Sequence, residues 1–146
     1  MSRNHRVVET LRADPRFAAL HRSLEFYYGD PEHTAAMDAF YSRFVARGDL
    51  VFDIGSHVGD RVGSFRRLGA RVVAVEPHPL CVQALGEIYA DDDQVRVVAA
   101  VCGADTGTVP FHLNSANPTV STASRHFIRS AEGAPGWRGQ VWDRTV

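Results

Sequence analysis

Apolar residues recur every three or four positions along the first part of the chain, a spacing that predicts helices. The pattern runs from Asn4 to about Ser42 and is clearest after Asp30. Asp30 can cap the free amides of a helix, Pro31 suits its first turn, and Gly48 is expected to end it. We expect the apolar stripe of this helix to pack on the next part of the chain, through Ala36, Met37, Phe40, Tyr41, Phe44 and Val45.

Three valine-rich segments of strand length follow, at 50–55, 71–76 and about 95–101. Two stretches with helical spacing separate them, and near-continuous apolar strands that alternate with helices are typical of a parallel sheet covered on both faces. The sequence therefore predicts a three-layer α/β/α fold with a helical N-terminal cap over residues 1–47 and a second domain over 48–146. The helix residues expected to face the sheet are Val62, Phe65, Leu68, Cys81, Leu85, Ile88 and Tyr89.

The pattern changes after Cys102, where turn residues replace the long apolar runs. Val109, Phe111 and Leu113 alternate with polar residues and predict a strand with one solvated face. The segment from 114 to 124, rich in Asn, Ser and Thr, is expected to be a loop, and Val141-Trp142 is expected to begin another strand.

Composition restricts the class of protein. The chain of 146 residues is 45% hydrophobic and 23% charged, with a formal net charge of -1, so we expect a soluble globular protein without a nucleic-acid or membrane partner. The N-terminus lacks the apolar core of a signal peptide, which predicts a cytoplasmic location. The two cysteines, Cys81 and Cys102, lie in apolar stretches and are expected to be buried and reduced.

All 16 basic residues are arginine, because the sequence contains no lysine. Phosphate-binding P-loops, pyridoxal-phosphate enzymes and lysine-dependent 2'-O-methyltransferases are therefore excluded. The seven histidines are scattered without ligand spacing, so no metal site is predicted.

The candidate chemistry lies at the end of the first predicted strand, in the segment from Asp53 to Gly59. Open α/β sheets bind ligands at the carboxyl ends of their strands. Gly55 permits a sharp turn, Gly59 lets the helix start approach a ligand, and the amides between them, including those of Ser56 and His57, are expected to face the pocket. Asp53 supplies a carboxylate suited to a positively charged amino-acid group.

A second acidic residue, Glu76, ends the next predicted strand, with Pro77 after it. Nucleoside sites place an acidic side chain there because its two oxygens can accept both ribose hydroxyls. Pro77 is then expected to lie against the adenine edge. The competing interpretation is an ordinary tight turn with a solvated Glu76.

The glycine spacing favours one nucleoside cofactor over another. A nicotinamide dinucleotide site requires G-x-G-x-x-G, in which the middle glycine admits the pyrophosphate. This chain has Gly-x-x-x-Gly from Gly55 to Gly59 and no glycine at the second position. S-adenosyl-L-methionine (SAM) has no phosphate to accommodate, so the sequence favours SAM, with an NAD(P)-linked oxidoreductase as the alternative.

Val51 to Asp60 resembles the first motif of the FkbM family of SAM-dependent methyltransferases. The segment from Ala74 to Pro79 is similar to the family's second motif, and 97–107 is similar to its third strand and the turn after it. The resemblance covers about Gly48 to Ser130. It implies a Rossmann-like class I fold, SAM as cofactor, Glu76 on the ribose, and methyl transfer to a small-molecule or sugar-like acceptor.

Members of that family continue into a further strand with an Asp-rich segment, whereas this sequence ends at Val146. The resemblance therefore implies a fragment, a truncated reading frame or a degenerate copy. An incomplete sheet would favour self-association, and a non-catalytic remnant is a further alternative. No catalytic residue is assigned; His57 and His126 are the candidate general bases.

Overall fold

The computed structural model describes residues 3–146. The chain divides into two compact units, Met1–Ala100 and Val101–Val146. The N-terminal helices therefore share one unit with the sheet, and the division does not follow the boundary near residue 47 that the sequence suggests. The two units are described separately below.

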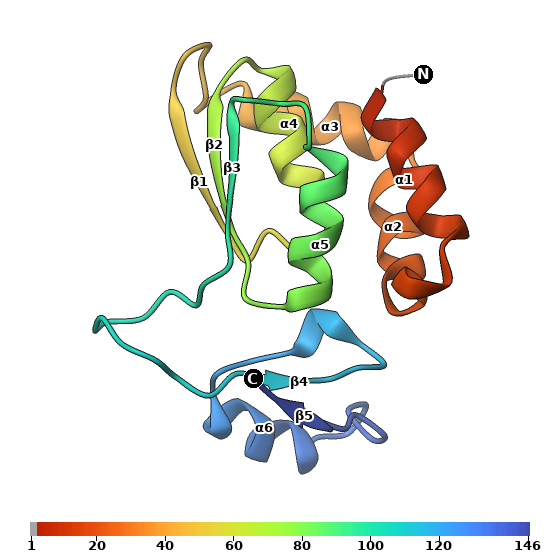
Figure 1. Cartoon of the computed structure of the whole chain (residues 1–146), viewed down its shortest axis with the longest axis vertical. Coiled ribbons are helices and arrows are strands. Elements are labelled where there is room, and N and C mark those ends of the chain that lie inside the picture. Colours follow the sequence, from red (N-terminus) through yellow and green to blue (C-terminus); the bar gives the residue numbers. More distant parts are fainter. Residues whose placement is uncertain (1–2) are drawn as a thin grey trace. The chain divides into compact units, whose positions relative to one another are not determined.

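The first unit is built on a parallel three-stranded sheet in the order β1-β2-β3 (Figure 1). Its strands are β1 (Leu50–Ile54), β2 (Arg71–Val75) and β3 (Val95–Val98). Leu50 pairs with Arg71 and Val72 with Val95, so all three carboxyl ends lie at the same edge. The predicted strands are confirmed, although β3 ends at Val98, before the predicted end near residue 101.

Two helices, α4 (Asp60–Arg67) and α5 (Pro79–Ile88), pack on one face of this sheet. Gly69 (φ +87°) lies in the turn between α4 and β2. Six of the seven residues predicted to face inward are buried, and Leu68 is half-buried.

The N-terminal helices lie on the same side of the sheet as α4 and α5 (Figure 1). They are α1 (Arg3–Ala13), the 3₁₀ turn η1 (Pro15–Leu20), α2 (His21–Tyr28) and α3 (Pro31–Tyr41). The predicted role of Asp30 as the N-cap residue of α3 is confirmed, because its side chain accepts hydrogen bonds from the amides of Glu32 and His33.

Two details of α3 were predicted wrongly. The helix ends at Tyr41 rather than at Gly48, because a turn follows at once and Gly48 instead donates to the Gly69 carbonyl. The apolar stripe is only partly buried. Tyr41 packs on Phe65 with ring centroids 4.7 Å apart, whereas Phe40 is 54% exposed.

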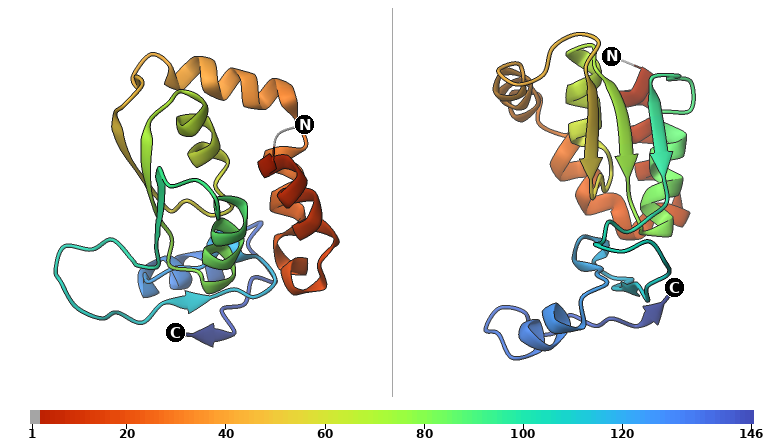
Figure 2. Two further views of the ribbon diagram at one scale, coloured as in Figure 1. Left: turned by 45° about the horizontal axis from the view of Figure 1, so that its top comes forward. Right: turned by 90° about the vertical axis from the view of Figure 1, so that its left-hand side faces the viewer.

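The prediction of helices on both faces of the sheet is also wrong for this unit. All its described helices lie on one side, and the opposite face of the sheet is bare of helix (Figure 2). Leu50, Phe52 and Ile54 point to that face and are each more than half exposed. Continuous apolar strands predict two apolar faces but not what covers the second.

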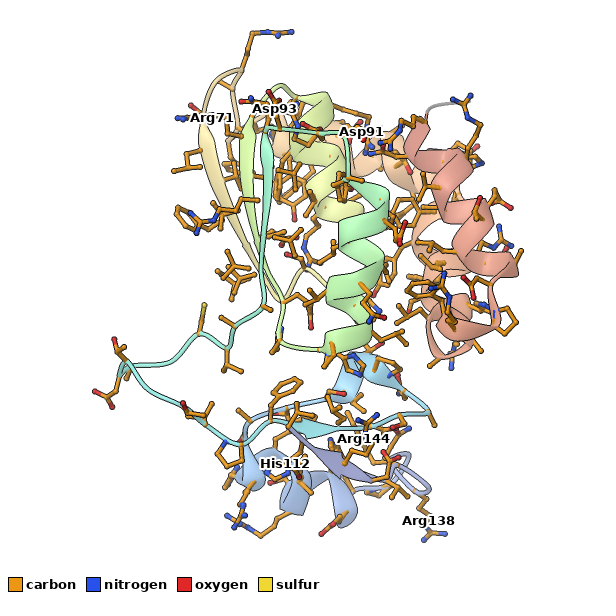
Figure 3. The ribbon with its side chains drawn as sticks, in the orientation of Figure 1. Arg71, Asp91, Asp93, His112, Arg138 and Arg144 are labelled. Atoms are coloured by element: carbon orange, nitrogen blue, oxygen red, sulfur yellow. The ribbon has the colours of Figure 1, made fainter. Side chains whose placement is uncertain are left out.

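The second unit contains β4 (His112–Leu113), η2 (Pro118–Val120), α6 (Arg125–Glu132) and β5 (Arg144–Thr145). β4 pairs antiparallel with β5, and His112 and Arg144 lie on these two strands (Figure 3). The predicted alternating strand is reduced to β4, and the predicted strand at Val141-Trp142 is replaced by β5 two residues later.

Two features of this unit, a helix and an exposed cysteine, were not expected from the sequence. Helix α6 was not predicted; the Ser124 side chain caps it by accepting from the Phe127 amide. Cys102 is exposed, contrary to expectation, because the chain around it joins no strand, whereas Cys81 is buried as expected. Among the described residues, no helix has both the length and the apolar character needed to cross a membrane.

Candidate functional site

The predicted turn between β1 and α4 lies at the carboxyl edge of the sheet and has an unusual backbone. Gly55, His57 and Gly59 all have positive φ, at +77°, +51° and +81°. A non-glycine residue at positive φ is uncommon, and such residues concentrate at functional sites. The Ser56 hydroxyl stabilises the turn by donating to the Asp53 carbonyl over 2.8 Å.

The amides of this turn are used inside the protein rather than left open to a pocket. Gly55 N and Ser56 N both donate to the Val75 carbonyl, at 2.8 and 3.2 Å. Gly59 N donates to the Ser56 carbonyl at 2.7 Å. The expectation that the amides between the glycines face the ligand is therefore wrong for Ser56, whose amide donates to the Val75 carbonyl, and for His57, whose amide donates to Glu76 Oε2.

The two glycines face different surroundings. A Cβ added to Gly55 would meet no atom within 4 Å, so open space lies above it. A Cβ at Gly59 would lie 2.6 Å from Leu85 Cδ2 and 2.9 Å from Tyr89 Cε2 on the α5 side. Gly59 therefore permits close packing of α5, and Gly55 is the position with room for a ligand.

Glu76 is buried at 6% exposure and holds the turn through its carboxylate. Its Oε2 accepts from His57 N and its Oε1 from His78 N, both at 2.8 Å. Burial raises the pKa of Glu76, although both amide bonds act in the opposite direction. This is not the solvated side chain of the competing interpretation. Pro77, which follows it, is half-buried.

Asp53 is 5% exposed, and its two oxygens differ. Oδ1 accepts from Arg61 Nε at 3.1 Å, whereas Oδ2 is buried without a hydrogen-bond partner among residues 3–146. Arg61 also donates from Nη2 to the Gly55 carbonyl at 3.1 Å. Burial acts to lower the pKa of Arg61, but Asp53 outweighs it and the pKa is raised.

Sequence analysis did not identify Arg61, although one signal was present. Arg61 lies in the first turn of α4, where the helix dipole disfavours a cation. An arginine at that end of a helix therefore indicates a nearby carboxylate, and Asp53 provides it.

His57 contributes its ring as well as its backbone to the site. Its Nδ1 lies 3.4 Å from the Cys81 Sγ, its ring meets Tyr27 edge-on at 6.0 Å, and its Nε2 is buried without a partner in the described part of the chain. Burial, with the charges of His78 and Arg61, lowers the pKa of His57 to about 4. Burial also raises the pKa of the Cys81 thiol.

Two tyrosine hydroxyls hold the backbone of the same turn, and sequence analysis missed both. Tyr28 from α2 donates to the Val58 carbonyl at 2.7 Å, and Tyr89 after α5 donates to the Gly59 carbonyl at 2.6 Å. The N-terminal helices thus help to fix the candidate site, although Tyr28 is 30 residues from Val58 in sequence.

The remaining candidate, His126, lies exposed on α6 and belongs to the other compact unit. That unit contains a cavity of about 520 Å³, and none of the predicted site residues lines it. Within residues 3–146, no group of three or more potential ligands is arranged to hold a metal ion.

The structure thus brings together Asp53, Gly55, Ser56, His57, Gly59 and Glu76 at one edge of the sheet, and adds Arg61, Tyr28 and Tyr89 to them. Comparisons with protein-family models, with curated proteins and with solved structures find no match.

Proposed function

We propose that the unit containing the sheet binds S-adenosyl-L-methionine and that the protein is a SAM-dependent methyltransferase of the FkbM type. The observation that carries the proposal is Asp53 Oδ2, a buried carboxylate oxygen without a partner among residues 3–146, at the start of the turn in which a Cβ added to Gly55 would meet no atom within 4 Å. A buried polar atom without a partner costs about 1–3 kcal/mol, so it requires an explanation. The ammonium group of a methionine moiety supplies one.

The use of the turn amides supports SAM over a dinucleotide. Pyrophosphate sites depend on free amides at the glycine turn and the helix start. Here Gly55, Ser56 and Gly59 all donate to carbonyls of the protein, and His57 donates to Glu76. The backbone of this turn therefore offers little to a phosphate, which counts against the NAD(P) alternative.

Glu76 remains suited to the ribose under this proposal. Each of its oxygens accepts one amide, and a carboxylate oxygen can accept a second hydrogen bond. The two amides fix the carboxylate in place before a ligand arrives, so its contacts with ribose hydroxyls carry little further cost in side-chain entropy.

Bound SAM would supply an electrophilic methyl group and a neutral thioether leaving group. The chain's contribution is then to position the cofactor and to exclude water. His57 is a weak base for this reaction, because a pKa of about 4 leaves it little affinity for a proton at neutral pH. We propose a small-molecule or sugar-like oxygen acceptor, and a Rossmann-like sheet of which β1, β2 and β3 are the first part.

Isothermal titration with S-adenosylhomocysteine tests the proposal, with NAD as the comparison ligand. We expect micromolar binding of S-adenosylhomocysteine and none of NAD. Glu76→Ala should weaken binding by about tenfold or more, the effect of losing charge-assisted hydrogen bonds. Because Glu76 also holds two amides, circular dichroism must first show that the variant is folded.

Absence of S-adenosylhomocysteine binding by a folded wild-type chain would refute the assignment. Binding of NAD instead would favour the oxidoreductase alternative, and binding of neither would leave a non-catalytic remnant.

A further inference from the structure

Arg61 is a charged residue at the candidate site whose role the cofactor assignment does not explain. Its side chain is 36% exposed and donates two hydrogen bonds within residues 3–146, to Asp53 Oδ1 and to the Gly55 carbonyl. A guanidinium has five N–H donors. Three of them make no hydrogen bond within the described part of the chain.

Neutralising Asp53 is not a sufficient role for Arg61. A structural arginine–carboxylate pair is most stable when two parallel N–H groups meet both oxygens. Arg61 instead divides its donors between one carboxylate oxygen and a backbone carbonyl, and Asp53 Oδ2 stays buried and unpartnered in the described residues. The pair therefore presents a free acceptor beside free cationic donors.

That combination matches a zwitterion. An α-amino acid carries an ammonium group, which needs an acceptor, and a carboxylate, which needs donors. We propose that Asp53 and Arg61 together form the receptor for the amino-acid end of the cofactor, with Asp53 Oδ2 accepting from the ammonium and Arg61 donating to the carboxylate. This inference rests on the proposed SAM site and adds to it a cationic binding residue.

The backbone around the pair is suited to this role. The Gly55 carbonyl, which accepts from Arg61, belongs to a turn held by the Val75 carbonyl and by Glu76. Arg61 itself lies on the first turn of α4, so its backbone is fixed by the helix. Both charges are thus in place before a ligand binds, which lowers the cost of binding.

The test compares three ligands that differ only at the amino-acid end. They are S-adenosylhomocysteine, its decarboxylated analogue S-adenosyl-3-thiopropylamine, and 5'-methylthioadenosine, which lacks both charged groups. For the wild-type protein we expect each lost charge to weaken binding by about tenfold or more. The order of affinity should follow the order just given.

The Arg61→Gln variant is then tested against the same three ligands. It should weaken S-adenosylhomocysteine by about tenfold or more and leave 5'-methylthioadenosine within about twofold, so that the preference for the carboxylate disappears. Arg66→Gln is the matched control on the same helix. Arg66 pairs with Asp92 and with the Ala70 carbonyl and, within residues 3–146, makes no hydrogen bond to the site residues, so its loss should leave the ligand preferences unchanged.

The outcomes separate the two proposals. If no adenosyl ligand binds the wild type, the SAM site itself fails. If all three bind with equal affinity, or if Arg61→Gln weakens them all equally, the zwitterion receptor is overturned while the SAM site stands. Should Arg61→Gln not fold, Arg61→Lys keeps the counter-charge of Asp53, and the wild-type ligand series alone still decides the question.

Discussion

The two glycines of the turn allow a direct test of which part of it is structural and which faces a ligand. Gly55 and Gly59 have almost the same φ, +77° and +81°. An alanine at either position therefore has the same conformational cost, about 1–2 kcal/mol. The difference is steric, because only the Cβ at Gly59 would meet Leu85 and Tyr89, at 2.6 and 2.9 Å.

Overpacking adds about 1–3 kcal/mol to the shared cost at Gly59. We therefore expect Gly59→Ala to destabilise the protein by about 2–5 kcal/mol and Gly55→Ala by about 1–2 kcal/mol. With a urea dependence of about 1.5 kcal/mol per molar, the unfolding midpoint should fall by about 1 M for Gly55→Ala and by about 2 M for Gly59→Ala.

Far-ultraviolet circular dichroism is the appropriate probe of this unfolding. Both tryptophans, Trp137 and Trp142, belong to the second compact unit, so their fluorescence reports on that unit. Five of the six α-helices in the described part of the chain belong to the first unit. The two variants should rank in the opposite order for ligand affinity, with the larger loss for Gly55→Ala. S-adenosylhomocysteine should bind Gly55→Ala at least about tenfold more weakly, because the new methyl group enters the ligand space. Equal midpoint shifts for the two variants would refute the steric argument.

Three other substitutions test further contacts. Tyr89→Phe removes the hydroxyl that holds the Gly59 carbonyl and should lower the free energy of unfolding by about 1–2 kcal/mol; an unchanged urea midpoint would contradict that bond. His57→Asn removes an imidazole whose pKa falls from 6.5 to about 4 on folding. Between pH 6.5 and 4 the imidazole is protonated in the unfolded chain but not in the folded one. The free energy of unfolding of the wild type should therefore fall by up to about 3 kcal/mol as the pH falls from 6.5 to 4. Asparagine tolerates the positive φ at this position, so the variant should lose less of its stability over the same pH range. Parallel pH profiles of stability for the two proteins would contradict the lowered pKa of His57. Phe52→Thr, at a side chain 60% exposed on the bare sheet face, should change stability by less than about 0.5 kcal/mol, unless the cost rises with protein concentration, which would indicate self-association.

Local signals account for the parts of the fold that the sequence predicted. The valine-rich runs are long enough to define strands without their neighbours, and β1 begins at Leu50 as expected. Asp30 and Pro31 define the start of α3 through backbone chemistry within a few residues. The same holds for the turn at Gly55, where a glycine follows a strand and precedes a helix.

Contacts between distant segments explain what the sequence did not predict. Tyr89 was expected only to face the sheet and Tyr28 was not singled out, because only the folded chain brings their hydroxyls to the turn. The exposure of Phe52 depends on which elements cover the sheet, and strand hydrophobicity does not report this. The position of Arg61 in the first turn of a helix signals that a carboxylate lies nearby. The sequence alone does not show which carboxylate it is.

The features of this turn that cost stability lie close together. His57 has a positive φ. Its Nε2 and the Oδ2 of Asp53 are both buried without a hydrogen-bond partner among the described residues. Meanwhile Glu76 and the two tyrosines hold the surrounding backbone firmly. A turn that served only to connect a strand with a helix would gain stability by losing these costs. Strained and unpartnered groups inside a firmly held backbone are typical of functional sites. The unused acceptor of Asp53 beside the unused donors of Arg61 is the reason that we propose a ligand with both charges.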